Sequence, residues 1–183
     1  MPETDASLVL TDSAGLDGRA AFTDLLRRHG QAIHAYLARR SGRDAADDLL
    51  GEVWLRAYAA RRTYDRRWPD ARPWLYGIAR NVLREHWRSL PAGGDPFGRA
   101  SEDPWPDVDA RLDAAARVAD LRRALARLTP GDREVLLLVT WEGLAPTEAA
   151  VALGIPPGTA RSRLHRARSL MRELLDDTSY QEA

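Results

Sequence analysis

The sequence predicts an all-α protein made of two small helical domains joined by a flexible acidic linker. Apolar residues recur at three- and four-residue spacings over residues 19–90 and again over 114–175, and no segment alternates as a β-strand does. Residues 91–113 between them hold four prolines, three glycines and six acids, a composition typical of a linker. Residues 1–18 form an acidic lead-in that we expect to be flexible, and residues 176–183 form an acidic tail.

Charge separates the chain into blocks of opposite sign, although 27 basic and 27 acidic residues cancel overall. Both helical blocks are basic and the connecting segments are acidic, which favours two modules facing a polyanion. The chain has no cysteine and no lysine, which excludes disulfides, thiolate metal sites, Walker-type nucleotide sites and Schiff-base enzymes. Without a long apolar run or a signal pattern, we expect a cytoplasmic protein with no membrane insertion of its own.

The first block reads as a series of helices interrupted at Ser41-Gly42 and around Tyr64–Pro73. The second block predicts helices over Ala114–Leu128, Pro130–Trp141 and Pro146–Leu153, and a long helix from Thr159 to Leu175.

Residues 144–174 carry the strongest motif, a short helix, a tight turn and a second helix. Pro146 suits the first turn of a helix. A backbone N–H at that position has no hydrogen-bond partner within the helix, so proline, which lacks the N–H, loses no hydrogen bond there. Gly154 follows the last apolar turn, where a left-handed residue is needed, and Thr159 is the expected N-cap of the next helix. This order is typical of a helix-turn-helix, whose second helix enters the major groove of DNA.

The long helix has one apolar face and one face with hydrogen-bond donors. At about 100° per residue, the donors fall within an arc of roughly 140°; they are Arg161, Ser162, His165, Arg166 and Ser169. Arginine guanidinium groups and hydroxyls can hydrogen-bond to base edges and phosphates. In an ordinary amphipathic helix, the same side chains would only face solvent. The preceding short helix and Gly154 favour DNA binding.

These residues resemble a known family. The segment GIPPGTARSRLHRAR (154–168) is similar to the recognition region of bacterial extracytoplasmic-function sigma factors, and LTPGDREVLLL (128–138) resembles the helix before it. In the first block, DAADDLLGEVWLRAY (44–58) resembles the family's polymerase-binding helix, and WLYGIARNVLREHWR (74–88) its promoter-melting helix. The resemblance covers residues 20–90 and 114–175, so it implies sigma domain two over 19–90 and sigma domain four over 114–175.

The resemblance implies a sigma factor that binds RNA polymerase core, recognises promoter DNA and helps open it, with no enzyme activity and no cofactor. An anti-sigma factor is the further partner that it implies. By position, the minus-thirty-five element would be met by Arg161, Ser162, His165 and Arg166. The minus-ten element would be met by Trp74, Arg80, Asn81 and Arg84. The clamp helices of the largest polymerase subunit would be met by Asp48, Leu49, Glu52, Val53 and Leu55.

Several of these residues also have a purely structural explanation. Asp44 would cap its helix, and acids near it would favour the positive end of the helix dipole. Trp74, Tyr76 and Trp87 could fill a small core, and we expect at least one of them to do so. On the long helix we expect Arg166 to read a base and Arg161 mainly to hold a phosphate.

The chain departs from the family pattern at four positions. Gly51 replaces a usual glutamine inside the polymerase-binding helix and should cost about 1 kcal/mol of helix stability. Ala71 replaces a usual aromatic, which puts the details of minus-ten base capture in doubt. Ala145 replaces a serine N-cap at a cost of about 1 kcal/mol, and Ala160 replaces a valine in the recognition helix.

The residues alone leave two other functions to consider, a free-standing DNA-binding regulator and a metal-dependent enzyme. A free-standing helix-turn-helix regulator would share the second domain, but it would not need the basic, aromatic-rich first domain. A metal hydrolase would need clustered ligands, yet His29 and His34 are five residues apart, and neither they nor His86 and His165 pair with a glutamate at zinc-site spacing. We therefore expect no catalytic residue and no metal site.

Overall fold

The computed structural model describes residues 18–65, 67–90 and 120–181, with side chains as far as Leu175, and these residues form helices and turns without a strand. The predicted all-α fold is confirmed. The predicted N-terminal lead-in and the linker over 91–113 lie outside the described residues.

Three helices make the first half: α1 (Arg19–Ser41), α2 (Arg43–Ala60) and α3 (Arg72–Ser89). Each packs against the other two, and their core includes Leu25, Ile33, Leu37, Val53, Leu75 and Leu83. The break predicted at Ser41-Gly42 is real, because Gly42 adopts φ 84°, a conformation that glycine enters without a steric penalty. A short 3-10 turn, Arg61–Thr63, follows α2 and begins the second predicted break.

One predicted cap is wrong. Gly42 is the N-cap residue of α2, so Asp44 lies inside the first turn and makes no capping hydrogen bond. The glycine that turns the chain between α1 and α2 leaves no room for a separate capping residue. Asp44 still stands at the positive end of the helix dipole, where a carboxylate is favourable.

The second half contains a helical segment at residues 120–127, then α5 (Pro130–Thr140), α6 (Pro146–Leu153) and α7 (Pro157–Gln181). Thr129 caps α5 by accepting a hydrogen bond from the Asp132 N–H at 3.2 Å. Ala145 cannot cap α6 with its side chain, but Glu148 accepts a hydrogen bond from the Ala145 N–H at 2.7 Å, which completes half of a capping box.

The helix-turn-helix is present as predicted, with Gly154 left-handed at φ 63° between α6 and α7. Two boundaries differ from the prediction. α7 begins at Pro157 rather than at Thr159, because proline fits the first turn of a helix and starts it earlier. It also continues to Gln181, so much of the predicted acidic tail is helical.

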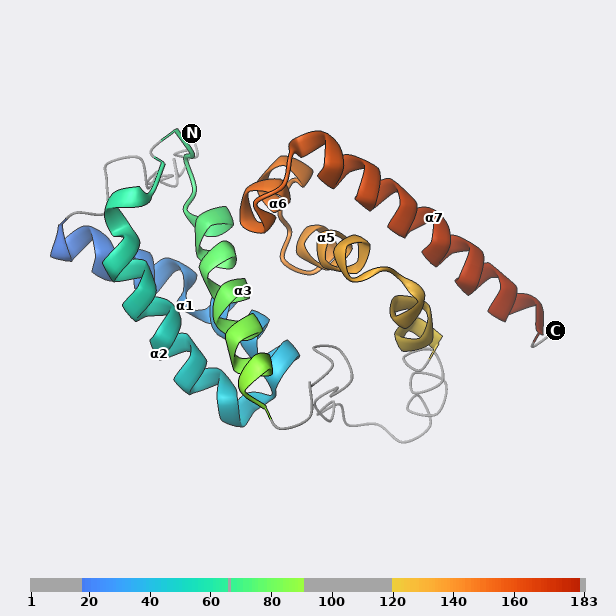
Figure 1. The fold of residues 1–183 in the computed structure, drawn as a ribbon, viewed down its shortest axis with the longest axis horizontal. Coiled ribbons are helices and arrows are strands. Elements are labelled where there is room, and N and C mark those ends of the chain that lie inside the picture. Colours follow the sequence, from blue (N-terminus) through green and yellow to red (C-terminus); the bar gives the residue numbers. More distant parts are fainter. Residues whose placement is uncertain (1–17, 66, 91–119, 182–183) are drawn as a thin grey trace, which may run out of the picture.

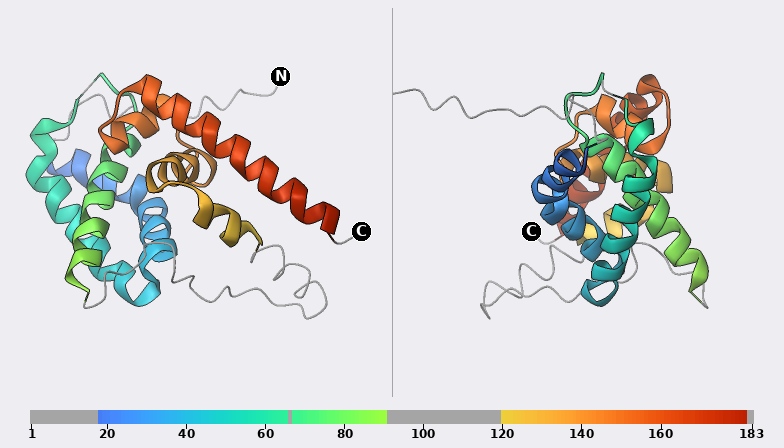
Figure 2. Two further views of the ribbon diagram at one scale, coloured as in Figure 1. Left: turned by 45° about the vertical axis from the view of Figure 1, so that its right-hand side comes forward. Right: turned by 90° about the vertical axis from the view of Figure 1, so that its left-hand side faces the viewer.

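The two halves pack against each other through α3 and α6, while α7 runs along the outside of the second half (Figure 1). Figure 2 shows the same contact from two further directions. The first helix of the helix-turn-helix therefore lies against the third helix of the other half.

Candidate functional site

The outer face of α7 presents the predicted DNA-reading residues. Arg161, Ser162, His165 and Arg166 are exposed, whereas the opposite side of the helix is buried through Ala160, Leu164, Ala167 and Met171. Ala160 and Ala150, on the two helices of the motif, are at most 1% exposed, so small side chains let α6 and α7 approach closely. The predicted polarity of the helix is confirmed.

Arg166 differs from its neighbours because it has an ionic partner inside the protein. Its guanidinium donates to both carboxylate oxygens of Asp132, at 2.9 and 3.4 Å. The Asp132 side chain is only 9% exposed. Burial alone raises the pKa of this carboxyl, but hydrogen bonds with Arg166 and Thr129 outweigh burial and hold the pKa below its usual value. Arg166 is therefore anchored at the first turn of α5, whereas Arg161 donates to the Pro157 carbonyl one turn back.

Two arginines of α7 were missed by the sequence interpretation. Arg168 and Arg172 are exposed and continue the row begun by Arg161 and His165. At about 100° per residue, these four side chains fall within roughly 60° of one another. The i, i+4, i+7, i+11 spacing in the sequence was the signal that could have found them. The result is a basic row along most of the described length of α7.

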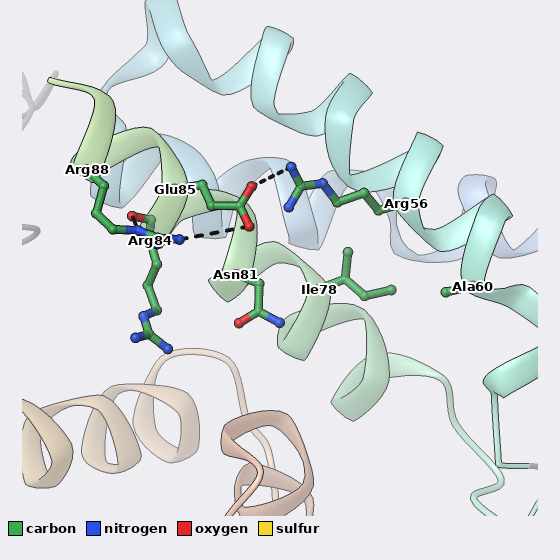
Figure 3. A pocket seen from close by; sticks show the side chains of 7 residues that line it. All are labelled: Arg56, Ala60, Ile78, Asn81, Arg84, Glu85 and Arg88. Carbon is green, nitrogen blue, oxygen red and sulfur yellow. Dashed lines mark hydrogen bonds and ion pairs between the residues drawn. The ribbon is translucent and has the colours of Figure 1, made fainter.

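On α3, the four residues predicted to meet the minus-ten element do not share one environment. Asn81 and Arg84 are exposed and line a shallow pocket of about 290 Å³ with Arg56, Glu85 and Arg88 (Figure 3). Trp74 is half-buried, with its ring 5.5 Å from that of Tyr64. Arg80 forms an ion pair with Glu134 of α5. The expectation that one aromatic fills the core is confirmed by Tyr76, which is 2% exposed.

Ala71, where the family pattern has an aromatic, is buried at the start of α3. A large ring at this position would need the surrounding core to repack. Base capture by an aromatic at this position is therefore not available to this chain.

The predicted polymerase-binding residues of α2 divide into exposed and buried groups. Leu55 is 70% exposed and Asp48 is exposed, while the Glu52 carboxylate is partly exposed and accepts from Arg56 at 2.6 Å. Leu49 and Val53 are 8% and 0% exposed and pack inside the first half, so their assignment to a partner surface is wrong. Their helical spacing, which suggested one continuous contact face, instead marks the core side of α2.

Tyr58 extends the exposed face of α2, although the sequence interpretation did not name it. It is 49% exposed and lies one turn beyond Leu55. Its ring packs edge-on against Phe22 with centroids 5.1 Å apart, which fixes its position. Leu55 and Tyr58 thus form an exposed apolar patch on this helix, with Asp48 and Glu52 on the preceding turns and the Arg61 guanidinium 4.1 Å over the Tyr58 ring.

A buried carboxylate joins the two halves. Glu142, in the loop after α5, has a side chain that is only 2% exposed. Arg39 donates to it at 2.6 Å, Arg40 at 3.2 Å and the Tyr76 hydroxyl at 3.3 Å. Burial first, and then the charge of Glu142, raise the pKa of Tyr76 far above its usual value, so the hydroxyl keeps the proton that it donates.

Two further contacts complete this junction, which we call the interdomain clasp. They are the ion pair between Arg80 and Glu134 and the close approach of α3 to α6 at Gly77. A Cβ atom on Gly77 would lie 3.3 Å from the Ala152 carbonyl oxygen, so the absence of a side chain permits this approach. The clasp consists of Arg39, Arg40, Tyr76, Gly77 and Arg80 with Glu134, Glu142 and Ala152.

Neither a membrane span nor a metal centre is found in the described part of the chain. None of its helices is both long and apolar enough to cross a bilayer. Its histidine and acidic side chains form no group of three or more that could hold a metal ion.

Comparisons with known proteins place both halves in one family. Residues 25–90 match the family model Sigma-70 region 2, and residues 119–171 match Sigma-70, region 4. The ECF RNA polymerase sigma factor SigC of Mycobacterium tuberculosis is 31% identical over 169 residues, which cover 92% of this chain and 91% of the relative. The chain belongs to the extracytoplasmic-function sigma factors.

This sigma factor is similar to further relatives over nearly its whole length. The RNA polymerase sigma factor CnrH of Cupriavidus metallidurans is 32% identical over 197 residues, covering 98% of this chain and 99% of CnrH. A solved structure of CnrH in complex with the cytosolic domain of CnrY has a TM-score of 0.59 at 31% identity, covering 91% and 93% of the two chains. The sigma factor RpoE in complex with the anti-sigma factor NepR, from Bartonella quintana, has a TM-score of 0.58 at 25% identity, covering 85% and 96%.

The family membership gives the sigma factor its activity. It is an alternative sigma factor that directs RNA polymerase to promoters at transcription initiation, and its second half is a DNA-binding helix-turn-helix. Proteins of this kind are transcription initiation factors and generally not enzymes.

Proposed function

We propose that the two halves of the sigma factor divide the work of initiation. The first half holds the polymerase core through α2 and the minus-ten element through α3, and α7 of the second half reads the minus-thirty-five element. The observation that carries this proposal is the presence of three separate exposed faces. One is acidic and apolar on α2, and two are basic on α3 and α7.

Run-off transcription with purified core polymerase on genomic promoter fragments tests the proposal as a whole. The sigma factor should direct transcripts with defined starts, which a free-standing regulator would not. Failure to bind core polymerase would instead favour the regulator.

On α2, we propose that Asp48, Glu52 and Leu55 contact the clamp helices of the largest subunit, with Tyr58 at the edge of the contact. The carboxylates offer charge, and Leu55 offers an apolar anchor that is already exposed to solvent. Leu49 and Val53 support this face from the core side without reaching a partner.

We expect Glu52→Arg to abolish core binding while the fold remains intact. The Glu52 side chain is 43% exposed, and Arg56 keeps Glu85 as a second partner, 2.5 Å away, when Glu52 is lost. Core binding is measured by native gel or by fluorescence anisotropy of labelled protein. Asp47→Arg is the matched control, since it makes the same charge change on the same helix about 140° away. If the Glu52→Arg variant bound core polymerase with native affinity, the proposal that α2 lies in the interface would be wrong.

On α7, we propose that Arg161, Ser162 and His165 read bases and that Arg166 holds a phosphate at the side of the groove. Asp132 satisfies part of the Arg166 fork and keeps it at the flank of the helix. The order of roles is thus the reverse of the one expected from the sequence. Arg168 and Arg172 continue the row and would add phosphate contacts.

On α3, Asn81 and Arg84 are available to DNA, whereas Trp74 and Arg80 are held by neighbours. Asn81 can make paired hydrogen bonds to a base edge, and Arg84 stands beside it in the same pocket (Figure 3). We propose that both contact the minus-ten element, with Trp74 as a stacking surface and Arg80 as a phosphate contact.

We further propose an anti-sigma partner for this sigma factor. CnrH and RpoE are described in complexes, with the cytosolic domain of CnrY and with the anti-sigma factor NepR respectively. Affinity purification of the tagged sigma factor from its own host, followed by competition with core polymerase, tests this. A co-purified protein that does not reduce core binding would not be an anti-sigma factor.

A further inference from the structure

The first turn of α5 meets two arginines of the recognition helix α7. Asp132 accepts hydrogen bonds from the Nη2 and Nε atoms of Arg166, at 2.9 and 3.4 Å. Arg163, one turn earlier on α7, lies over Gly131, where a Cβ atom would be only 2.8 Å from its Nη1 atom. Arg163 is partly buried, whereas the Arg166 side chain is 61% exposed. The Asp132 carboxylate therefore stands at a turn that two guanidinium groups of α7 approach.

Arg166 starts from a position on α7 that faces outward. The buried residues of α7 lie on one side of the helix; they are Ala160, Leu164, Ala167 and Met171. At about 100° per residue, the direction opposite to them runs close to Ser162. Arg166 lies only about 40° from Ser162 on this projection, and Arg161 lies about 100° from it. An arginine at position 166 without an internal partner could reach the base edges that Ser162 faces.

Asp132 keeps the Arg166 guanidinium away from those base edges. The Asp132 side chain is 9% exposed, and the Asp132 N–H donates to the cap residue Thr129 at 3.2 Å, which fixes the start of α5. An arginine reads guanine by placing two donors on the O6 and N7 atoms of the base in the major groove. While its Nε and Nη2 atoms serve Asp132, the Arg166 guanidinium stays at the first turn of α5 instead.

Loss of the Asp132 charge should release Arg166 rather than Arg163. Without this acid, the two arginines lie one turn apart on α7 as like charges, and such neighbours repel each other. Arg163 is the more buried of the two and packs over Gly131. Arg166, which is mostly exposed, is therefore the side chain that moves outward.

We propose that Asp132 is a specificity-determining residue of the recognition helix, which keeps Arg166 on a phosphate contact and off the base edges. It is a positioning residue, because it acts through Arg166. The proposal rests on the function proposed above for α7. The promoter preference of the sigma factor then depends on an acid of α5, outside the helix-turn-helix itself.

The experiment compares holoenzymes made from the full chain and purified core polymerase. A promoter found by run-off transcription is randomised over its minus-thirty-five element, and sequencing of the bound duplexes gives the preference at each base pair. Asp132→Asn is the test variant, because it removes the charge with little change in shape. Asp132→Glu keeps the charge, and glutamate is favourable at this third helical position after a threonine cap. Glu173→Gln is the matched control, since it removes one acid from an exposed position of α7.

Asp132→Asn should gain a preference of about tenfold for guanine at one base pair, as expected for one new bidentate arginine contact. Asp132→Glu should keep the native preference. Glu173→Gln should also keep it and bind all sequences slightly more tightly, because a negative charge near the phosphates is lost. Arg166→Ala in the Asp132→Asn background should abolish the new preference, since the acid acts through that arginine.

An unchanged preference in Asp132→Asn would overturn the proposal, and so would a new preference that survives Arg166→Ala. A merely structural Asp132 would give the first result, with a lower affinity for all sequences alike. The reading role of α7 has its own test in Arg161→Ala. If Arg161→Ala changes neither affinity nor preference, the proposed function of α7 fails. If Arg161→Ala relaxes the preference and Asp132→Asn leaves it unchanged, only the role of Asp132 fails.

Discussion

Asp132 places a buried carboxylate beneath the recognition helix and so separates two arginines that look alike in the sequence. Arg166 reaches this carboxylate, whereas Arg161, about 140° away on the same helix, is exposed and donates to the Pro157 carbonyl of its own helix. A side chain with an internal anchor has less freedom to follow a base edge. The roles proposed for the two arginines therefore follow from their environments rather than from residue type.

Substitution of each arginine by alanine should therefore give different binding profiles. Arg161→Ala should cost about 1–3 kcal/mol on the best promoter sequence and relax the preference at one base pair. Arg166→Ala should weaken all sequences alike and lower the salt slope by about one unit. Both are measured with the full chain against a duplex library at several salt concentrations. If neither variant changes affinity or preference, α7 does not lie in the major groove.

Asp132→Asn should lower the free energy of unfolding by about 1 kcal/mol at pH 7, a modest value because the Arg166 side chain is 61% exposed. The folded-state pKa of Asp132 lies below its unfolded value, so its contribution is complete above the unfolded pKa, near 3.9. It is lost as the pH falls through the lower folded-state pKa. Urea unfolding at pH 7 and pH 3 should show the gap between the two proteins shrinking in acid. A gap that is constant with pH would mean that the lost charge is not responsible.

At the scale of elements, periodicity and turn residues predict helices well because both are local properties. The helix over residues 74–88, the turn at Gly42 and the left-handed Gly154 all follow from spacing or backbone preference. Helix ends were less certain, since Pro157 and Thr159 are both acceptable starts. On α2 the sequence could not separate Leu49 and Val53 from Leu55, because apolar residues suit a core and a docking face equally.

Gly51 tests the stability of α2 as a separate element. It is exposed inside the helix, and a Cβ there would meet no atom within 4 Å. Gly51→Ala should therefore raise the free energy of unfolding by about 0.5–1 kcal/mol. Gly77→Ala is the matched comparison in α3 and should not stabilise, because its Cβ would press on the Ala152 carbonyl. Equal stabilisation by both changes in urea titrations would contradict the close approach of α3 and α6.

At the scale of the whole molecule, the clasp could not be predicted from the sequence. Its partners Arg40 and Glu142 are separated by 102 positions, and neither belongs to a motif. Acids and arginines are so abundant in this chain that any pair of them looks equally plausible. The engagement of Arg80 by Glu134, 54 positions away, was equally unpredictable from the sequence.

The clasp should make the two halves unfold together. Glu142→Ala should reduce this coupling by about 3 kcal/mol, because it leaves buried arginine charge without its partner. Urea unfolding followed by tryptophan fluorescence and by circular dichroism should show coincident transitions in the native sequence and two separate ones in Glu142→Ala. Glu173→Ala should behave like the native sequence. Coincident transitions in Glu142→Ala would show that the halves do not depend on this carboxylate.

Arg56 links the proposed polymerase face of the first half to its proposed DNA pocket. Its guanidinium is shared between Glu52, on the proposed polymerase side, and Glu85, which lines the pocket with Asn81 and Arg84 (Figure 3). A cation from the polymerase that approaches Glu52 competes with Arg56 for that carboxylate. Because Glu52 then neutralises less of the Arg56 charge, Arg56 makes the electrostatic potential of the pocket more positive, and the pocket is where single-stranded DNA would arrive. Loading of the enzyme on one side would thus raise the attraction for a negatively charged strand on the other, with no movement of the backbone.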